Sequence, residues 1–283
     1  VNSYEIFVNQ KQTRIRNSRG VDVTFSGFDC EIEVVTNSRK DDHEIEIYKD
    51  LRFSDKSAEK IIAEVRGMFH TGRQRLNAVP TRQNEHADVL LSGDAVGRFF
   101  QYFAMHTNAS YQYTGVAKAK IGEAITGADA DPLNIRLMPT LDGSAKNAPY
   151  DETGMPVAER VLFENGICRS YWGSLQHAHY IGMKDTTSMN NMVVEGGSKT
   201  LDELRSMPHI EITDFSAFDM DAVSGTCGGE IRLALGRPTT SGSLSARYDD
   251  VLKNLTFSKE TQQINNRVVP CAVLLRDVTV AGE

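Results

Sequence analysis

The sequence is poor in cysteine and has neither a long apolar run nor a dense block of basic residues. Four cysteines are spread over 283 residues without a C-x-x-C pair, a pattern typical of reduced structural thiols rather than of a disulfide framework or a zinc knuckle. We therefore expect a cytoplasmic protein. The longest apolar stretch, residues 268–275, is far shorter than the roughly 20 residues that cross a bilayer as a helix, so we expect no membrane partner.

The charge balance is acidic. The chain has 31 basic and 38 acidic residues and a net charge of −7. A protein that follows a phosphate backbone needs clustered lysine and arginine, and this sequence has no such cluster. We therefore predict no direct nucleic-acid partner.

Residues 3–49 show the alternation of apolar and polar side chains that predicts β-strands. We expect separate strands at residues 4–8, 21–25, 30–35 and 43–48, with glycine-containing turns before the middle two. A helix is predicted over residues 54–76, with Ser54 or Asp55 as its N-cap. Its apolar stripe, which we expect to pack on the sheet, consists of Ala58, Ile61, Ile62, Val65, Met68 and Phe69.

A polar stretch at residues 77–88, which contains Pro80, is the best candidate for a join between domains. After it we expect a strand at residues 87–91 and a helix from Ser92. The apolar side chains that recur at helical spacing, and that we expect in the core, are Val96, Phe99, Phe100 and Phe103.

The rest of the chain consists of short apolar segments broken by Gly, Pro and Asp, which predicts short strands. We expect strands at residues 133–138, 157–163, 192–195, 210–218, 230–235 and 273–280, and helices only at residues 175–182, 201–207 and 246–252. The predicted fold class is α+β. A small N-terminal sheet-plus-helix region, residues 1–80, precedes a larger, mainly antiparallel β C-terminal domain with a few helices, residues 81–283.

Several motifs in series resemble the TldD/PmbA family of peptidases, also called modulators of DNA gyrase. The resemblance covers most of the chain and is strongest from Ala87 onward, where order and spacing carry it more than any single motif. The matching segments are the strand and helix at 88–106, the turn at 150–156, the Glu-Asn-Gly hairpin at 162–166, the Glu-Gly-Gly at 195–197 and the terminal strand at 278–282.

The zinc-bearing branch of that family has a His-Glu-x-x-x-His motif, which falls here on Gln101, Tyr102 and His106. A neutral amide is a poor zinc ligand, and a tyrosine with an ordinary pKa of about 10 cannot replace glutamate as a base near neutral pH. The resemblance therefore implies the metal-less branch, with no metal and no zinc cofactor. By family position, these three residues are expected to line a substrate groove.

The resemblance also implies partners. Members are expected to form a homodimer, or a heterodimer with a zinc-bearing relative, around a groove for an extended peptide held by sheet-edge hydrogen bonds. Residues 1–80 resemble the end of the family's N-terminal region, so most of that region is expected to be missing. Such a chain would serve proteolysis or peptide maturation as a subunit, and whether it is itself an enzyme stays open.

Two alternatives remain. Cys227 lies between glycines, so it could be the nucleophile of a metal-independent hydrolase with His177 or His179 as its base. The competing interpretation of Cys227 is a small residue at a tight strand entry. His177 and His179 would share one face of a strand but not of a helix, and the predicted helix there disfavours paired metal binding. The second alternative is an interaction or assembly module without catalysis.

Overall fold

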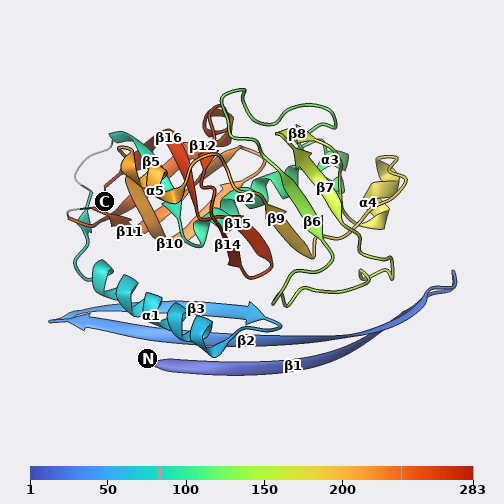
Figure 1. Ribbon diagram of the computed structural model, residues 1–283, viewed down its shortest axis with the longest axis horizontal. Coiled ribbons are helices and arrows are strands. Elements are labelled where there is room, and N and C mark those ends of the chain that lie inside the picture. The colour runs from blue at the N-terminus through green and yellow to red at the C-terminus, as the bar shows by residue number, and fades with distance from the viewer. Residues whose placement is uncertain (82–84, 237, 283) are drawn as a thin grey trace.

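The computed structural model describes residues 1–81, 85–236 and 238–282, and Figure 1 shows its layers. The N-terminal layer is an antiparallel sheet in the order β1-β2-β3, formed by β1 (Ser3–Arg16), β2 (Asp22–Lys40) and β3 (His43–Phe53). The predicted separate strands at 21–25 and 30–35 are one strand. Gly27 pairs with Lys11 in the middle of the ladder, so this glycine is tolerated within a strand instead of forming a turn.

Helix α1 (Ala58–Arg75) covers the face of this sheet that points toward the rest of the molecule (Figure 1). Its N-cap is Ser57, which accepts a hydrogen bond from the Lys60 backbone N–H, so the predictions of Ser54 and Asp55 are wrong. Ser54 instead continues the chain from β3 and donates its backbone N–H to the Gly143 carbonyl at 2.8 Å. The predicted packing of the helix on the sheet is confirmed, although Ile62 of the stripe is exposed.

The larger region contains a closed five-stranded barrel. Its strands are β5 (Glu85–Ser92), β10 (Ile210–Asp221), β11 (Thr226–Leu235), β12 (Thr240–Arg247) and β16 (Ala272–Ala281). They pair in that order, and β16 closes the ring by pairing with both β12 and β5. The ring is closed, but its joins between β5 and β10 and between β12 and β16 are each only three residue pairs long. Two short strands extend this sheet: β4 (Val79–Pro80) beside β12 and β13 (Thr256–Phe257) beside β16.

A second sheet of six strands lies beside the barrel (Figure 1), in the order β14-β15-β9-β6-β7-β8. It consists of β6 (Ile135–Met138), β7 (Arg160–Glu164), β8 (Ile167–Cys168), β9 (Asn191–Val194), β14 (Thr261–Ile264) and β15 (Arg267–Pro270). Asn165 has a φ of 51° at the turn between β7 and β8, which fits the predicted Asn-Gly hairpin. Most pairings are antiparallel, and the α+β class with its small N-terminal sheet is confirmed.

Helix α2 (Ala95–His106) lies between the barrel and the second sheet and is the centre of the core. All four aromatic and aliphatic residues predicted for the core are fully buried, and Phe103 packs edge-on against Phe163 of β7 at 5.8 Å between ring centroids. Burying each such side chain contributes about 1.5–3 kcal/mol. This helix therefore holds the two sheets together, and its last turn fixes the position of the residues described below.

The remaining helices are short. They are α3 (Ala109–Tyr113), α4 (Leu175–Tyr180), α5 (Leu201–Ser206) and α6 (Tyr248–Val251). The helix predicted at 246–252 begins only at Tyr248, because Ala246 and Arg247 pair with β11 in β12. None of the helices in the described ranges is long and apolar enough to span a membrane. Residues 82–84 of the predicted domain join lie outside the described residues, and the join itself stays a prediction.

Candidate functional site

The last turn and a half of α2 presents the three residues expected to line a groove, but on different sides of the helix. Tyr102 and His106 are four residues apart, so they lie about 40° apart around the axis, whereas Gln101 lies about 100° from Tyr102. The rings of Tyr102 and His106 are in contact, with centroids 4.1 Å apart. Gln101 instead accepts a hydrogen bond from Arg267 of β15, at 3.2 Å. The three side chains therefore do not converge on one point.

Tyr102 is part of a buried aromatic stack. Its ring lies parallel to that of Tyr248 at 3.7 Å, and neither side chain is exposed. The Tyr248 hydroxyl donates to the Phe99 carbonyl at 3.0 Å, whereas the Tyr102 hydroxyl has no hydrogen-bond partner among the described residues. Burial raises the pKa of Tyr102 well above its ordinary value. This phenol therefore stays protonated at neutral pH and cannot act as a base.

His106 is neutral and already engaged. Its Nδ1 accepts the Lys118 backbone N–H at 3.1 Å, so in the neutral tautomer the proton is on Nε2. Burial, helped by the nearby Lys118 ammonium and opposed by Asp249, lowers the pKa of His106 to about 4. Nε2 is buried and has no hydrogen-bond partner in the described parts of the chain. Neither ring nitrogen is therefore free to accept a proton or to bind a metal without rearrangement.

A small cleft of about 320 Å³ opens beside Tyr102. Lys118 and Asp249 line it and form an ion pair, 2.6 Å between Nζ and Oδ1, which lowers the pKa of Asp249. The other lining residues are Ala124, Ile125, Thr126, Gly127, Leu252 and Lys253. Because its one carboxylate is paired and ionised, this cleft lacks a base with a pKa near 7.

The residues at this site do not fit the zinc ion expected in the zinc-bearing branch of the family. A zinc site in a peptidase needs three protein ligands from histidine, cysteine and carboxylate. The Gln101 amide is bound to Arg267, Tyr102 is protonated, and His106 stands alone. Within residues 1–81, 85–236 and 238–282, no group of three such side chains could hold a metal.

The structure does not bring Cys227 together with the histidines proposed as its base. Cys227 lies in β11, is 4% exposed, and pairs with Met220 and Ala246 of the adjacent barrel strands. Burial raises the pKa of its thiol to about 12, which disfavours the thiolate that a nucleophile needs. The observed geometry fits the small residue in a tight strand better than the nucleophile.

His177 and His179 belong to α4, which packs on α3 at the far end of the second sheet (Figure 1). His177 Nδ1 shares a hydrogen bond with Ser174 Oγ at 2.9 Å, and its ring lies 5.9 Å from that of Tyr113. In the part of the chain that the structure describes, no hydrogen bond joins either histidine to Cys227. The Cys227 hydrolase therefore has no geometric support.

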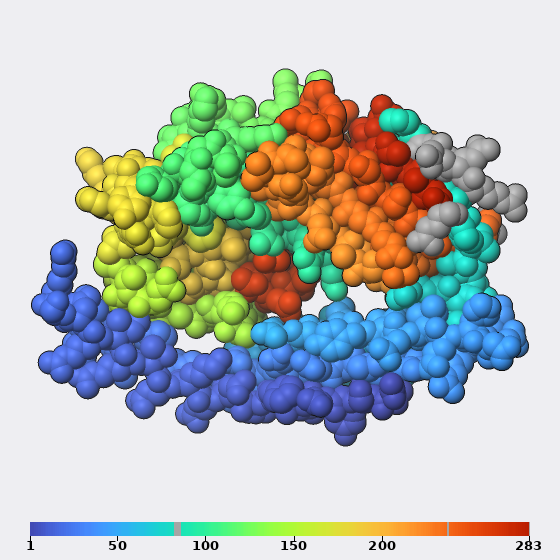
Figure 2. All heavy atoms as spheres, turned by 180° about the vertical axis from the view of Figure 1, so that it is seen from behind, coloured from blue at the N-terminus to red at the C-terminus, as the bar shows by residue number. Residues whose placement is uncertain are grey.

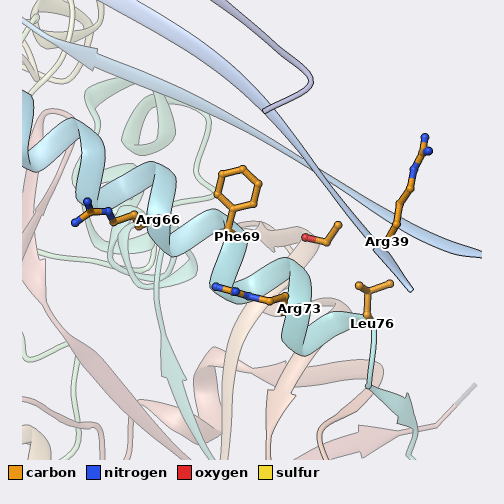
Figure 3. A pocket seen from close by; sticks show the side chains of 6 residues that line it. Arg39, Arg66, Phe69, Arg73 and Leu76 are labelled. Carbon is orange, nitrogen blue, oxygen red and sulfur yellow. The ribbon is translucent and has the colours of Figure 1, made fainter. Parts of the chain in front are cut away.

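A cavity of about 540 Å³ lies between α1 and the end of β2 and has an arginine-rich lining. Figure 3 shows that the side chains of Arg66 and Arg73 extend to the same side from α1, whereas that of Arg39 points away from them. A site for one anion needs donors that converge. We therefore do not assign a ligand to this cavity.

Sequence reasoning missed Lys118, Tyr248, Asp249 and Arg267. Tyr248 and Asp249 lie far along the chain from α2, and nothing in their local pattern marks them. Only Arg267 had a usable signal. It follows Asn265-Asn266, a pair typical of a two-residue hairpin turn, and Asn265 has a φ of 52° there.

Comparison with known proteins gives one family and several solved structures of similar fold. Residues 84–282 match the model of the PmbA/TldA metallopeptidase C-terminal domain. Among solved structures, TldE from Thermococcus kodakarensis is similar, with a TM-score of 0.78 and 17% identity over 97% of this chain and 68% of that one. A proposed modulator of a DNA gyrase from Thermotoga maritima has a TM-score of 0.77 and 18% identity over 98% of this chain and 68% of that one.

A third similar structure is a proposed modulator of DNA gyrase from Bacteroides thetaiotaomicron, with a TM-score of 0.74 and 16% identity. The match covers 94% of this chain and 63% of that one. No curated protein matches by sequence. At identities this low, the structural likeness establishes the fold alone.

Proposed function

Because the chain belongs to the PmbA/TldA metallopeptidase family, we propose that it is a metal-less member that binds an extended peptide and does not cleave it by itself. The observation that carries this proposal is the last turn of α2. There the zinc motif is replaced by an amide bound to arginine, a protonated phenol in the core, and a neutral histidine. Hydrolysis of a peptide bond needs an activated nucleophile, and this site supplies none.

The N-terminal sheet offers a surface for an extended peptide. Among the described residues β1 pairs only with β2, so its other edge is free along fourteen residues. An unpaired edge readily adds a further strand. Three apolar side chains on one face of β1 are exposed: Tyr4 by 68%, Ile6 by 57% and Val8 by 62%.

The exposed stripe of β1 points toward the rest of the molecule. Ile6 is opposite Ile32 of β2, which is opposite Leu51 of β3, and Leu51 is buried. Figure 2 shows a hollow where the N-terminal sheet meets the larger region, next to the red segment of β14 and β15. A peptide of alternating side chains could place its apolar side chains against this stripe.

The proposed function includes a partner subunit. A chain that holds peptide without cleaving it contributes to proteolysis or peptide maturation only beside a zinc-bearing relative. A homodimer would instead serve binding or assembly. The partner is therefore expected to supply the metal and the base, and this chain the peptide-binding surface.

We expect the purified protein to contain far less than one zinc per chain and to leave peptides intact. The measurement is elemental analysis per chain, together with mass in solution and incubation with a peptide mixture read by mass spectrometry. Near-stoichiometric zinc, or cleavage that a chelator stops, would contradict the metal-less assignment. Adding a zinc-bearing relative is the positive control for cleavage.

Replacing Ile6 with lysine is expected to weaken peptide binding at least tenfold. A tenfold loss of affinity corresponds to about 1.4 kcal/mol, and burying one isoleucine side chain against the peptide contributes more than that. The probe is a fluorescein-labelled peptide of alternating valine and threonine, measured by anisotropy. Ile62→Lys is the matched control, since Ile62 is 48% exposed but lies on α1. Equal affinity of the Ile6 variant and the wild type would remove β1 from the proposal.

A further inference from the structure

Arg267 is a part-buried arginine without a carboxylate partner. It lies at the start of β15, and its Nη2 donates to Gln101 Oε1 at 3.2 Å. Its Nε is buried and has no hydrogen-bond partner among the described residues. Its Nη1 lies close to Gly97, 4.0 Å from where a Cβ would stand. The guanidinium is therefore fixed along one side of α2 by contacts with two successive turns.

A second unpaired arginine lies beside it. Arg98 is exposed on α2, three residues before Gln101 and therefore on the same side of the helix. Within the described residues neither Arg98 nor Arg267 forms an ion pair. The nearest acidic side chain on this helix, Asp94, lies 3.8 Å from Lys49 instead. Burial and the charge of Arg98 together lower the pKa of Arg267.

This arrangement differs from other part-buried arginines of the fold. Arg75 pairs with Asp214 at 3.2 Å, Arg160 with Asp185 at 3.0 Å, and Arg276 with Asp88. A guanidinium taken out of water costs free energy unless an anion compensates it. Arg267 is such a guanidinium, and the exposed, unpaired Arg98 beside it adds a second positive charge. The pair indicates that the compensating anion belongs to a ligand.

We propose that Arg98 and Arg267 bind a carboxylate group of the peptide held in the hollow between α2, the β14–β15 hairpin and the N-terminal sheet. The inference rests on the proposed peptide-binding function and adds the charge of the ligand. Arg267 is oriented by Gln101, so its Nη1 can donate to one carboxylate oxygen while the exposed guanidinium of Arg98 donates to the other. Figure 2 shows the red β14–β15 segment bordering this hollow. The carboxylate belongs to either the C-terminus or an acidic side chain of the peptide.

The test uses two kinds of probe on the full chain. Succinate, titrated by calorimetry, tests the arginine pair alone. The labelled valine-threonine peptide tests it in the groove, in three forms: with a free C-terminal carboxylate, with a C-terminal amide, and as the amide with one internal glutamate. The variants are Arg267→Gln and the exposed Arg98→Gln. Arg169→Gln is the matched control, because Arg169 is an exposed arginine paired with Glu164 in the second sheet.

We expect Arg267→Gln and Arg98→Gln each to weaken succinate binding about tenfold or more, the worth of one charge-assisted contact, and Arg169→Gln to leave it unchanged. The free-acid peptide should bind at least tenfold more tightly than the amide if the C-terminus is the ligand. If an acidic side chain is the ligand, the amide with one internal glutamate should bind at least tenfold more tightly than the amide without it.

Three results separate this inference from the proposed function. Equal binding of all three peptides, unaffected by Arg267→Gln and Arg98→Gln, overturns the carboxylate site and leaves peptide binding intact. Succinate binding that both variants abolish, with no peptide bound, supports the site and contradicts the proposed function. Absence of succinate binding to the wild type overturns the arginine pair as an anion site.

Discussion

Replacing Tyr102 with glutamate, the residue of the zinc motif at this position, is expected to destabilise the fold by about 4 kcal/mol or more. The side chain is fully buried, and its ring lies 3.7 Å from that of Tyr248. Glutamate loses this stacking and places an ionisable group where no cation or donor is arranged for it, and each of these changes alone costs on the order of 1–3 kcal/mol. The measurement is the free energy of unfolding by urea.

The loss of stability caused by Tyr102→Glu should grow as pH rises. A carboxyl group buried at this position would have a pKa above its unfolded value of about 4.3. The unfolded state therefore releases its proton at lower pH than the folded state does, and stability falls as pH rises above about 4.3. We expect Tyr102→Glu to be closer to the wild type at pH 4.5 than at pH 8.

Tyr102→Phe is the matched control. It keeps the ring and removes a hydroxyl that has no hydrogen-bond partner among the described residues, so it should change stability by less than about 1 kcal/mol. If Tyr102→Glu were as stable as the wild type at pH 8, the aromatic stack would not be the core that the structure shows. The expected result means that a zinc site cannot be restored here by point substitution without repacking Tyr248.

The periodic elements of the fold could be predicted from sequence, whereas the long-range contacts at the site could not. The spacing of Val96, Phe99 and Phe103 was sufficient to place α2 in the core, because a buried helix needs one apolar face. Strand β12 was missed because Thr240–Arg247 has three serines and one glycine among eight residues and little of the β-branched and aromatic character that marks a strand. Its position in the barrel comes from closure with β16 and not from its own propensity.

For the candidate site, the sequence predicted only that the zinc motif is absent. Aligning the zinc motif identified Gln101, Tyr102 and His106, but not their different surroundings. The contacts that decide their chemistry come from Tyr248, Lys118 and Arg267. Two of these partners are more than a hundred residues away in sequence, and a local pattern, the Asn265-Asn266 turn, stands only beside Arg267. A stacked pair or a hydrogen bond of this kind is set by the tertiary fold, so the sequence of one chain carries no direct signal of it.

His106 should make the protein markedly less stable in mild acid. Its pKa is about 4 in the folded state against 6.5 for an ordinary histidine, so the unfolded state binds the proton more tightly. The contribution of the neutral His106 to the free energy of unfolding is then fully present above pH 6.5 and is lost as pH falls toward 4. The shift corresponds to about 3 kcal/mol. Burial causes most of it, and the Lys118 ammonium adds to it while Asp249 opposes it.

Comparing variants isolates this histidine from the carboxylates that also titrate in acid. His106→Asn keeps an oxygen that can accept the Lys118 backbone N–H but cannot be protonated in this range, so its unfolding free energy should fall by about 3 kcal/mol less than that of the wild type between pH 7 and pH 4. His43→Asn, at an exposed histidine of β3, should follow the wild type. Parallel curves for His106→Asn and the wild type would contradict the neutral, buried imidazole. Since the metal-less assignment and the Nε2–H tautomer both depend on that imidazole, this comparison tests the chemistry of the site without knowledge of its ligand.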